Sequence, residues 1–341
     1  MHYAHNLISA SEDHAFPLSR QHLLTPASFL RRDHMAAKIL MVGSIMMDLI
    51  LQMPRIPHPS ESLLGTTYSN AGGGKGSNSA VAAARAGGNV SVCGTLGQDA
   101  NGEALLGMLK SAGINVSHLM LKEGANTGMA VIMLEENGMN RLAIYTGANN
   151  DTTPESVEAA FADDTYDALM MQLEIPFESN LRAFTLAKER GMITCLDAGP
   201  AQDYPIEKFQ GITILSPNET ETEALVGILP KDEESCIAAS KILHERSGCK
   251  YVVLKMGEKG SFIYGEGICE MVPTFKVDAV DPTAAGDCFT GVLVKQYAET
   301  GDIVSSARYA SAAAAISVQH LGAQPSLPEK EAIDAFLAER A

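Results

Sequence analysis

The residues with the clearest chemical potential lie in segment 281–291, which reads Asp-Pro-Thr-Ala-Ala-Gly-Asp-Cys-Phe-Thr-Gly. Three small residues leave backbone N–H groups open to close approach by a ligand: Ala284, Ala285 and Gly286. The apolar run that follows predicts a buried helix, whose N-terminus would stabilise a negative charge. Asp287 is therefore either a general base beside a phosphoryl group under attack, or an acidic first-turn residue that only stabilises the helix.

Composition limits the class of protein. The chain has 341 residues, a net charge of −16, 46% hydrophobic and 19% charged residues, as expected for a globular protein with a substantial core. The negative charge argues against nucleic acid or an anionic membrane surface as a partner. The six cysteines include no C-x-x-C pair, and no apolar run approaches the length of a membrane span. We therefore expect buried free thiols and a cytoplasmic location.

Residues 1–36 differ from the rest of the chain. They hold five of the nine histidines, carry charges of both signs and show no sustained hydrophobic periodicity. No positively charged stretch followed by an apolar one is present, so the pattern is not that of a secretory signal. We predict a disordered N-terminal extension at 1–36 and a folded domain at 37–341.

Apolar strand-like and helix-like segments alternate from residue 37 onward. Strands are predicted at 38–42, 90–93, 168–172, 192–197, 212–215 and 251–256. This alternation indicates an α/β fold with a doubly wound, mostly parallel sheet and helices on both faces. Two pairs of segments do not fit it, namely 49–53 with 63–68, and 129–134 with 141–145 around a turn with Asn137-Gly138. We expect them to form a small separate sheet, a lid over the ligand site, within about 47–70 and 127–147.

Polar residues follow several of the predicted strands, where open α/β sheets carry their ligands: Asp48, Glu174, Asp197, Asn218, Glu221 and Gly257. Segment 70–79, Asn-Ala-Gly-Gly-Gly-Lys-Gly-Ser-Asn-Ser, precedes an Ala-rich helix. It is not a Walker A loop, because Gly76 follows Lys75, and not a Rossmann fingerprint, because Ser77 replaces the last glycine. Either it is a tight turn only, or it offers Lys75 and Asn78 to a polar ligand.

Four separated segments together resemble the ribokinase (PfkB) family of carbohydrate kinases: 43–48, 73–80, 217–221 with its Asn-x-x-Glu, and 281–291. Segments 147–149, 171–174 and 322–326 add to the match, which covers residues 38–337. The resemblance implies a ribokinase-like fold with a small β-sheet lid. It also implies phosphorylation of a sugar hydroxymethyl group by ATP, with Mg²⁺ as cofactor.

The resemblance also assigns roles to residues of the phosphoryl-transfer site. Asp287 would be the catalytic base, and Ala284, Ala285 and Gly286 would form an anion hole for the phosphoryl group. The nucleotide would contact Asn218, Lys255, Gly257, Gly260, Gly286 and Ser311, while Glu221 would support Mg²⁺ through water. Asn218 could equally cap the helix that follows it, and the Gly-x-x-Gly of 257–260 could be a simple turn. K⁺ is expected among six further residues: Asp281, Thr283, Ser317, His320, Gly322 and Ser326.

The same resemblance implies eight contacts to the sugar: Met46, Asp48, Gly73, Gly74, Lys75, Gly76, Asn78 and Glu174. Without the resemblance, Glu174 would be interpreted as a solvated residue at the end of a strand. Ribokinases usually have Asn where this chain has Met46, and methionine cannot donate a strong hydrogen bond to a hydroxyl. The substitution is more like deoxyribokinases, so D-ribose and 2-deoxy-D-ribose both stay open as the pentose that is phosphorylated. The alternatives are another sugar, a phosphosugar bound through Arg141, a nucleoside, or a non-catalytic sugar-binding regulator. A homodimer formed through the lid is expected.

Overall fold

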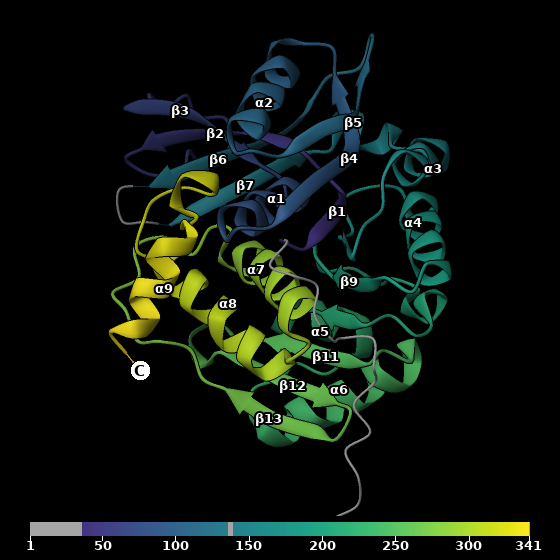
Figure 1. The fold of residues 1–341 in the computed structure, drawn as a ribbon. Helices are drawn as coiled ribbons and strands as arrows, with labels where there is room; N and C mark the ends of the chain where they lie inside the picture. The colour runs from purple at the N-terminus through teal and green to yellow at the C-terminus, as the bar shows by residue number, and fades with distance from the viewer. Residues whose placement is uncertain (1–35, 136–138, 341) are drawn as a thin grey trace, which may run out of the picture. The chain divides into compact units, whose positions relative to one another are not determined.

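The computed structural model describes residues 36–135 and 139–340 (Figure 1). Residues 1–35 of the predicted extension, and the Asn137-Gly138 turn, lie outside the described residues. Among the helices of the described part, none is long and apolar enough to cross a membrane.

A nine-stranded sheet forms the core, in the order β13-β12-β11-β10-β9-β8-β1-β4-β5. Every neighbouring pair from β11 to β5 is parallel, and β12 and β13 continue the sheet antiparallel. The strands are β1 (Lys38–Val42), β4 (Asn89–Gly97), β5 (Asn115–Lys122), β8 (Ala168–Met171), β9 (Ile193–Asp197), β10 (Ile214–Ser216), β11 (Tyr251–Lys255), β12 (Ser261–Gly265) and β13 (Ile268–Val272). The predicted doubly wound, mostly parallel sheet is confirmed.

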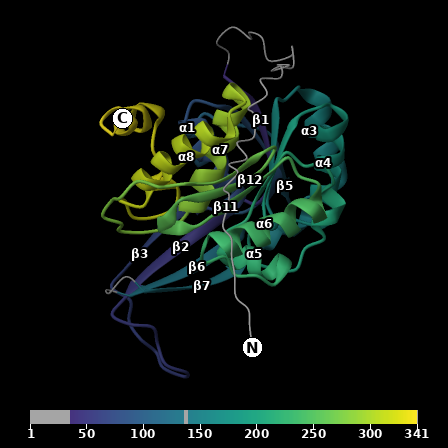
Figure 2. The same cartoon turned by 90° about the horizontal axis from the view of Figure 1, so that it is seen from below.

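Helices cover both faces of this sheet (Figures 1 and 2). One face packs on α1 (Lys75–Arg85), α2 (Ala100–Ser111), α7 (Ala285–Thr300), α8 (Ile303–Ser317) and α9 (Lys330–Ala338). The other packs on α3 (Pro154–Asp163), α4 (Phe177–Glu189), α5 (Glu219–Val226) and α6 (Glu233–Ser247). Along β1, Ile39 and Met41 join the first core and Leu40 and Val42 the second, all fully buried. Burial on both faces explains why the central strands are continuous apolar runs.

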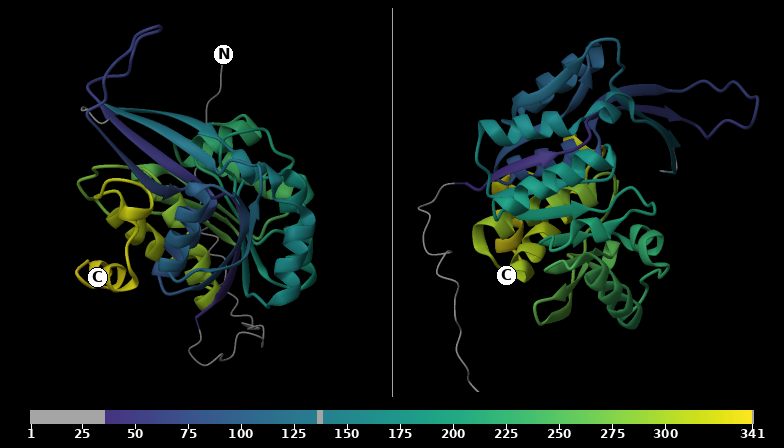
Figure 3. Two further views of the ribbon diagram at one scale, coloured as in Figure 1. Left: turned by 90° about the horizontal axis from the view of Figure 1, so that it is seen from above. Right: turned by 90° about the vertical axis from the view of Figure 1, so that its right-hand side faces the viewer.

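A second sheet of four strands, in the order β3-β2-β6-β7, projects from the core (Figures 2 and 3). Its strands are β2 (Met46–Met53), β3 (Thr67–Gly73), β6 (Gly128–Glu135) and β7 (Asn140–Tyr145). The early pair β2–β3 and the hairpin β6–β7 are antiparallel, and β2 joins β6 in parallel. These strands do form a separate small sheet, which we call the lid sheet.

Three details of the sequence interpretation are wrong. The second early strand was expected at 63–68 but spans Thr67–Gly73, so four of the ten residues of segment 70–79 are strand and Gly74 alone separates β3 from α1. Asp48 was expected beyond a strand but lies within β2. The cause in both cases is pairing of β2 with β3 from Met46–Gly73 to Gln52–Thr67, a tertiary contact that overrides the low strand propensity of glycine. The sheet also has two unpredicted edge strands, β5 and β13, which are half exposed and lack a clear apolar pattern.

Candidate active site

The segment 281–291 turns into the first residues of α7. Ala284 is the N-cap residue and has φ +61°, in the left-handed region, and α7 begins at Ala285. The Ala285 N–H donates to the Pro282 carbonyl at 3.1 Å. Because the Cys288 N–H already donates to the Ala284 carbonyl at 2.8 Å, the first-turn N–H groups available to an anion are those of Gly286 and Asp287.

Asp287 is almost fully buried at this helix start, with 6% of its surface exposed. Its two carboxylate oxygens have different partners, both from α1. Asn78 Nδ2 donates to Oδ2 at 2.9 Å, and Lys75 Nζ lies 3.4 Å from Oδ1. Packing of α1 against α7 therefore joins the glycine-rich segment to the segment 281–291, as expected if both serve one site.

Two acidic side chains of the predicted sugar site, Glu174 and Asp48, lie close to the start of α1. Glu174 Oε2 accepts from Ser44 Oγ at 2.5 Å and from the Lys75 N–H at 3.1 Å. The carboxylate of Asp48 lies against the backbone of Gly73, where any Cβ would overlap it. This close approach explains a glycine at position 73. Ser44, which positions Glu174, was missed as a site residue, although it stands directly after a predicted buried strand.

Burial raises the pKa values of two carboxyl groups in this cluster, those of Asp48 and Glu174. Burial, with the nearby charges of Asp287 and Glu174, raises the pKa of Asp48 to about 7. Burial also raises the pKa of Glu174, although Ser44 and Lys75 oppose the change. The pKa of Lys75 is raised despite burial, because Asp287 and the other carboxylates around it stabilise the ammonium. Lys75 therefore stays charged in the middle of the acidic cluster.

This pKa of Asp48 predicts a pH-dependent stability in the absence of sugar. Between pH 4 and 7 the folded protein keeps a proton on Asp48 that the unfolded chain has released. The free energy of unfolding therefore has its full value from this group below pH 4, falls as the pH rises, and has lost the contribution once the pH passes 7. The difference corresponds to at most about 4 kcal/mol. We expect Asp48→Asn to raise the Tm by several degrees at pH 8 and by much less at pH 5. Asp203→Asn, at an exposed carboxylate, is the control, and a lower Tm of Asp48→Asn at pH 8 would contradict the assignment.

Asn218 and Glu221 form a capping box at the start of α5. Asn218 Oδ1 accepts from the Glu221 N–H, and Glu221 Oε2 accepts from the Asn218 N–H, both at 2.8 Å. Asn218 is thus a helix cap, as its alternative interpretation held. Glu221 Oε1 lies 3.8 Å from Lys75 Nζ, and Gly199 leaves room for this approach, since a Cβ there would overlap both groups. Lys75 therefore spans from Asp287 on one side to Glu221 on the other.

Three of the other predicted nucleotide contacts, Lys255, Gly257 and Gly260, lie at the end of β11. Gly257 and Gly260 have φ +53° and +108° and form the turn between β11 and β12. Ser311 is buried within α8. The Lys255 side chain points inward, where its Nζ binds Asp197 Oδ2 at 2.6 Å. Asp197 was noted as a residue after a strand but not as part of the site.

The residues predicted for a monovalent cation come from two segments that the fold brings together. The Asp281 carboxylate accepts from the Thr283 N–H at 2.9 Å and from the Gly322 N–H at 2.8 Å. Ser317 and Ser326 lie 3.1 Å apart through their hydroxyls, and His320 is exposed. Within residues 36–135 and 139–340, no group of three or more His, Cys, Asp or Glu residues could hold a metal ion. A cation here would depend on backbone carbonyl groups.

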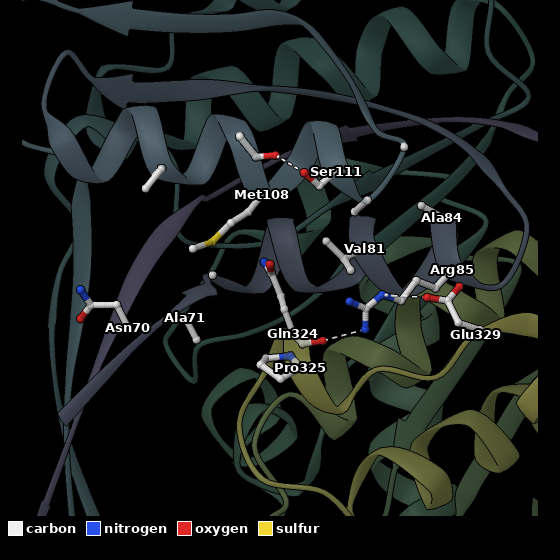
Figure 4. A pocket seen from close by; sticks show the side chains of 15 residues that line it. Asn70, Ala71, Val81, Ala84, Arg85, Met108, Ser111, Gln324, Pro325 and Glu329 are labelled. Atoms are coloured by element: carbon white, nitrogen blue, oxygen red, sulfur yellow. Dashed lines mark hydrogen bonds and ion pairs between the residues drawn. The ribbon is translucent and has the colours of Figure 1, made fainter. Parts of the chain in front are cut away.

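The structure has a cavity of about 890 Å³ elsewhere, between α1, α2 and β3 (Figure 4). Its lining includes Asn70, Met108, Ser111 and Gln324, and none of Asp48, Lys75, Asn78, Glu174, Glu221 or Asp287. Gln324 connects it to the site, because its Nε2 donates to Ser77 Oγ at 3.0 Å on the first turns of α1. The predicted general base and the polar side chains predicted to bind the sugar are therefore in the cluster around Asp287 and not in this cavity.

Comparisons with known proteins agree with this geometry. The family model described as pfkB family carbohydrate kinase matches residues 36–330. A ribokinase of Haemophilus influenzae is 36% identical over 306 residues, which is 89% of this chain and 99% of that protein. A deoxyribokinase of Salmonella typhi is 31% identical over 302 residues, 88% and 98% of the two chains.

A solved structure gives the same result for the fold. Arabidopsis thaliana ribokinase, complexed with ribose and ATP, has a TM-score of 0.80 and 30% identity, and the match covers 89% of this chain and 99% of that one. The family match takes in both the lid sheet and the helix start at Asp287. The chain therefore belongs to the pfkB family of carbohydrate kinases, and it is an ATP-dependent sugar kinase with a ribokinase-like fold.

Proposed function

We propose that the protein transfers the γ-phosphoryl group of ATP to the 5-hydroxymethyl oxygen of a pentose, D-ribose or 2-deoxy-D-ribose. Asp287 takes the proton of the attacking hydroxyl, and the N–H groups at the start of α7 stabilise charge on the transferring phosphoryl group. The new bond joins the sugar oxygen to phosphorus as the bond to the ADP oxygen breaks, and the proton ends on Asp287.

The observation that carries this proposal is the position of Asp287 between two sets of groups. On one side Asp287 is bound by Asn78, a predicted sugar contact. On the other side Lys75 Nζ lies between Asp287 and Glu221, the residue predicted to support Mg²⁺. A base at such a junction can reach a hydroxyl while an anion is held at the helix N-terminus. The pentose is inferred from the named ribokinase and deoxyribokinase relatives.

The test is ADP release with a panel of acceptors: ribose, 2-deoxyribose, fructose, fructose 6-phosphate and nucleosides, each with and without K⁺. Turnover is expected with at least one of the two pentoses at higher kcat/KM than with the other acceptors. A preference for fructose, for fructose 6-phosphate or for a nucleoside would contradict the pentose proposal but leave a sugar kinase. Absence of turnover with every acceptor would contradict the catalytic proposal.

Met46 is the residue on which we base the choice between the two pentoses. It is fully buried in β2, and its side chain is on the same face of the lid sheet as that of Asp48, two residues on. A hydroxyl opposite a thioether loses a strong partner, so this position favours a sugar that lacks one. Met46→Asn is expected to raise the ribose to deoxyribose ratio of kcat/KM by about tenfold, measured in the same assay. The control Met46→Leu also cannot donate and should leave the ratio unchanged; an unchanged ratio in Met46→Asn would refute the assignment.

Two ions complete the proposal. Mg²⁺ would enter with ATP, since Glu221 is a single carboxylate with one oxygen bound to the Asn218 N–H, which suits contact through water better than a closed protein cage. Its chemistry when bound is to neutralise phosphate charge.

K⁺ would be held near Asp281 by backbone carbonyls, and support comes from the hydrogen bonds that join the two segments there. The cytoplasmic location stays a prediction.

Dimerisation through the lid sheet is the last part of the proposal. Leu142 and Ile144 of β7 are 52% and 53% exposed, and they share one face of the sheet with the buried Ile132 and Ala130 opposite them. A half-exposed apolar face of this kind indicates a protein partner, and a second copy would cover it. We expect Ile144→Asp to convert a dimer into a monomer in size-exclusion chromatography with light scattering. Tyr145→Asp, equally exposed on the opposite face, is the control; a wild-type monomer, or an Ile144→Asp dimer, would contradict this.

A further inference from the structure

A buried ion pair next to the site joins Lys255, one of the predicted nucleotide contacts, to Asp197, and the proton transfer proposed for Asp287 does not require it. Lys255, at the end of β11, has 8% of its surface exposed, and Asp197, at the end of β9, has 2%. Lys255 Nζ and Asp197 Oδ2 are 2.6 Å apart, and Thr290 Oγ1 of α7 donates to the same oxygen at 2.8 Å. Desolvating two charges is costly, and an apolar pair of similar size is often as stable, so retention of this pair is not explained by stability alone.

The position of Lys255 connects this pair to the reacting groups. Its Nζ lies 4.0 Å from Glu221 Oε2, on the side of that carboxylate opposite Lys75, whose Nζ approaches Oε1 at 3.8 Å. Its side chain also passes under the start of α7, where Nζ is 3.9 Å from the Cβ position of Gly286. Its backbone N–H binds the Pro217 carbonyl at 2.8 Å, which holds β11 to the segment before α5.

The burial of Asp197 means that the lysine cannot turn toward solvent without loss. Asp197 would keep the hydrogen bonds from Thr290 Oγ1 at 2.8 Å and from the Gly199 N–H at 3.3 Å but would lose its 2.6 Å ion pair. A buried carboxylate without its counter-charge is strongly disfavoured. The ammonium is therefore held at one place, between Asp197, Glu221 and the backbone at Gly286. Fixed charges of this kind are effective in catalysis because they need no reorganisation during the reaction.

We propose that Lys255 is a positioning residue of the phosphoryl-transfer site: anchored by Asp197 and Thr290, it fixes the Glu221 carboxylate and supplies a positive charge behind the backbone N–H groups at Gly286. The proposal deepens the proposed function and rests on it. The lysine acts through Glu221 and the helix start and does not touch the sugar.

The test compares variants that separate folding from catalysis. Lys255→Met removes the ammonium and leaves Asp197 unpaired, so it is expected to lower the Tm. The double variant Asp197→Asn/Lys255→Met leaves no unpaired charge and is expected to recover most of the Tm. Thr290→Val removes only the second donor to Asp197 and keeps the shape of the side chain. Lys250→Met, at an exposed lysine five residues earlier, is the matched control.

The expected result is that the double variant, once its Tm is recovered, still has a kcat at least 100-fold below wild type, with the pentose KM changed less than threefold. Thr290→Val should lower kcat by about tenfold, and Lys250→Met should not change it. A double variant with kcat within threefold of wild type would show a purely structural pair and overturn the proposal. If the double variant does not fold, a wild-type kcat in Thr290→Val would overturn the proposal.

A second measurement keeps this result separate from the pentose kinase proposal. Calorimetry with ATP and Mg²⁺ needs no sugar and no turnover. The double variant is expected to bind the nucleotide at least tenfold more weakly than Lys250→Met does. If the wild type phosphorylates no acceptor, the proposed function fails while this comparison still decides the role of Lys255; equal affinities would overturn it.

Discussion

Asp287→Asn is expected to lower kcat by about 10³-fold while the affinity for ATP changes less than threefold. General bases contribute about 10²- to 10⁴-fold, and asparagine keeps the shape of the side chain but cannot accept the proton of the attacking hydroxyl. Among the described residues, Asp287 is the carboxylate that contacts both Asn78 and Lys75, and it is almost fully buried there. ADP release under saturating ribose or deoxyribose measures kcat, and calorimetry measures ATP binding.

The same variant decides between the two interpretations of Asp287. If the carboxylate only stabilised the N-terminus of α7, its loss would cost about 0.3–1 kcal/mol of stability and leave kcat near the wild-type value. Asp302→Asn is the matched control, because Asp302 caps α8, the next helix, with hydrogen bonds to Val304 and Ser305. That control should leave kcat unchanged. A near-normal kcat in Asp287→Asn would refute the role of base.

Lys75→Met is expected to lower kcat by at least 100-fold. Its Nζ lies 3.4 Å from Asp287 Oδ1 and 3.8 Å from Glu221 Oε1. In the proposed reaction charge would pass between these groups, and removal of one such donor costs about 10²- to 10³-fold. The pentose KM should change less than threefold, because the part of Lys75 that faces Glu174 is the backbone N–H. That N–H remains in the variant.

This split between kcat and KM separates two roles for Lys75. A direct hydrogen bond from the ammonium to the sugar would raise the pentose KM tenfold or more and leave kcat little changed. Lys122→Met is the control, because Lys122 is a half-exposed lysine at the end of the edge strand β5, where its ion-pair partner is Asp151. Loss of activity in the control would point to a general effect of lost charge.

Much of the fold could be read from local patterns. The buried strands were predictable because residues such as Ile39–Val42 are apolar without interruption, which a strand between two helical layers requires. The two edge strands β5 and β13 were not, since they are half exposed and their pattern is that of a loop. The exact span of β3 depended on its pairing with β2, which no local propensity contains.

The candidate site divides in the same way. Local sequence was enough to give the residue types and the helix starts: Asp287 after three small residues, the Asn-x-x-Glu capping box, and the glycines that precede Lys75 and Asn78. Side-chain type and short-range spacing are local properties, so one chain segment is enough to express them. Even the resemblance to a kinase family rested on such segments taken in order.

Which of these groups contact one another depends on the folding of the whole domain. Asp287 and Asn78 are 209 residues apart in the chain, and Lys255 and Asp197 are 58 apart, yet each pair is in hydrogen-bond contact. Folding sets such distances through the packing of α1 on α7 and the adjacency of parallel strands. The interactions that raise the pKa of Asp48 and tie Lys255 to Asp197 act only over a few ångströms inside a desolvated core. Segment 281–291 thus specified a carboxylate at a helix N-terminus, and the fold supplied the charges around it.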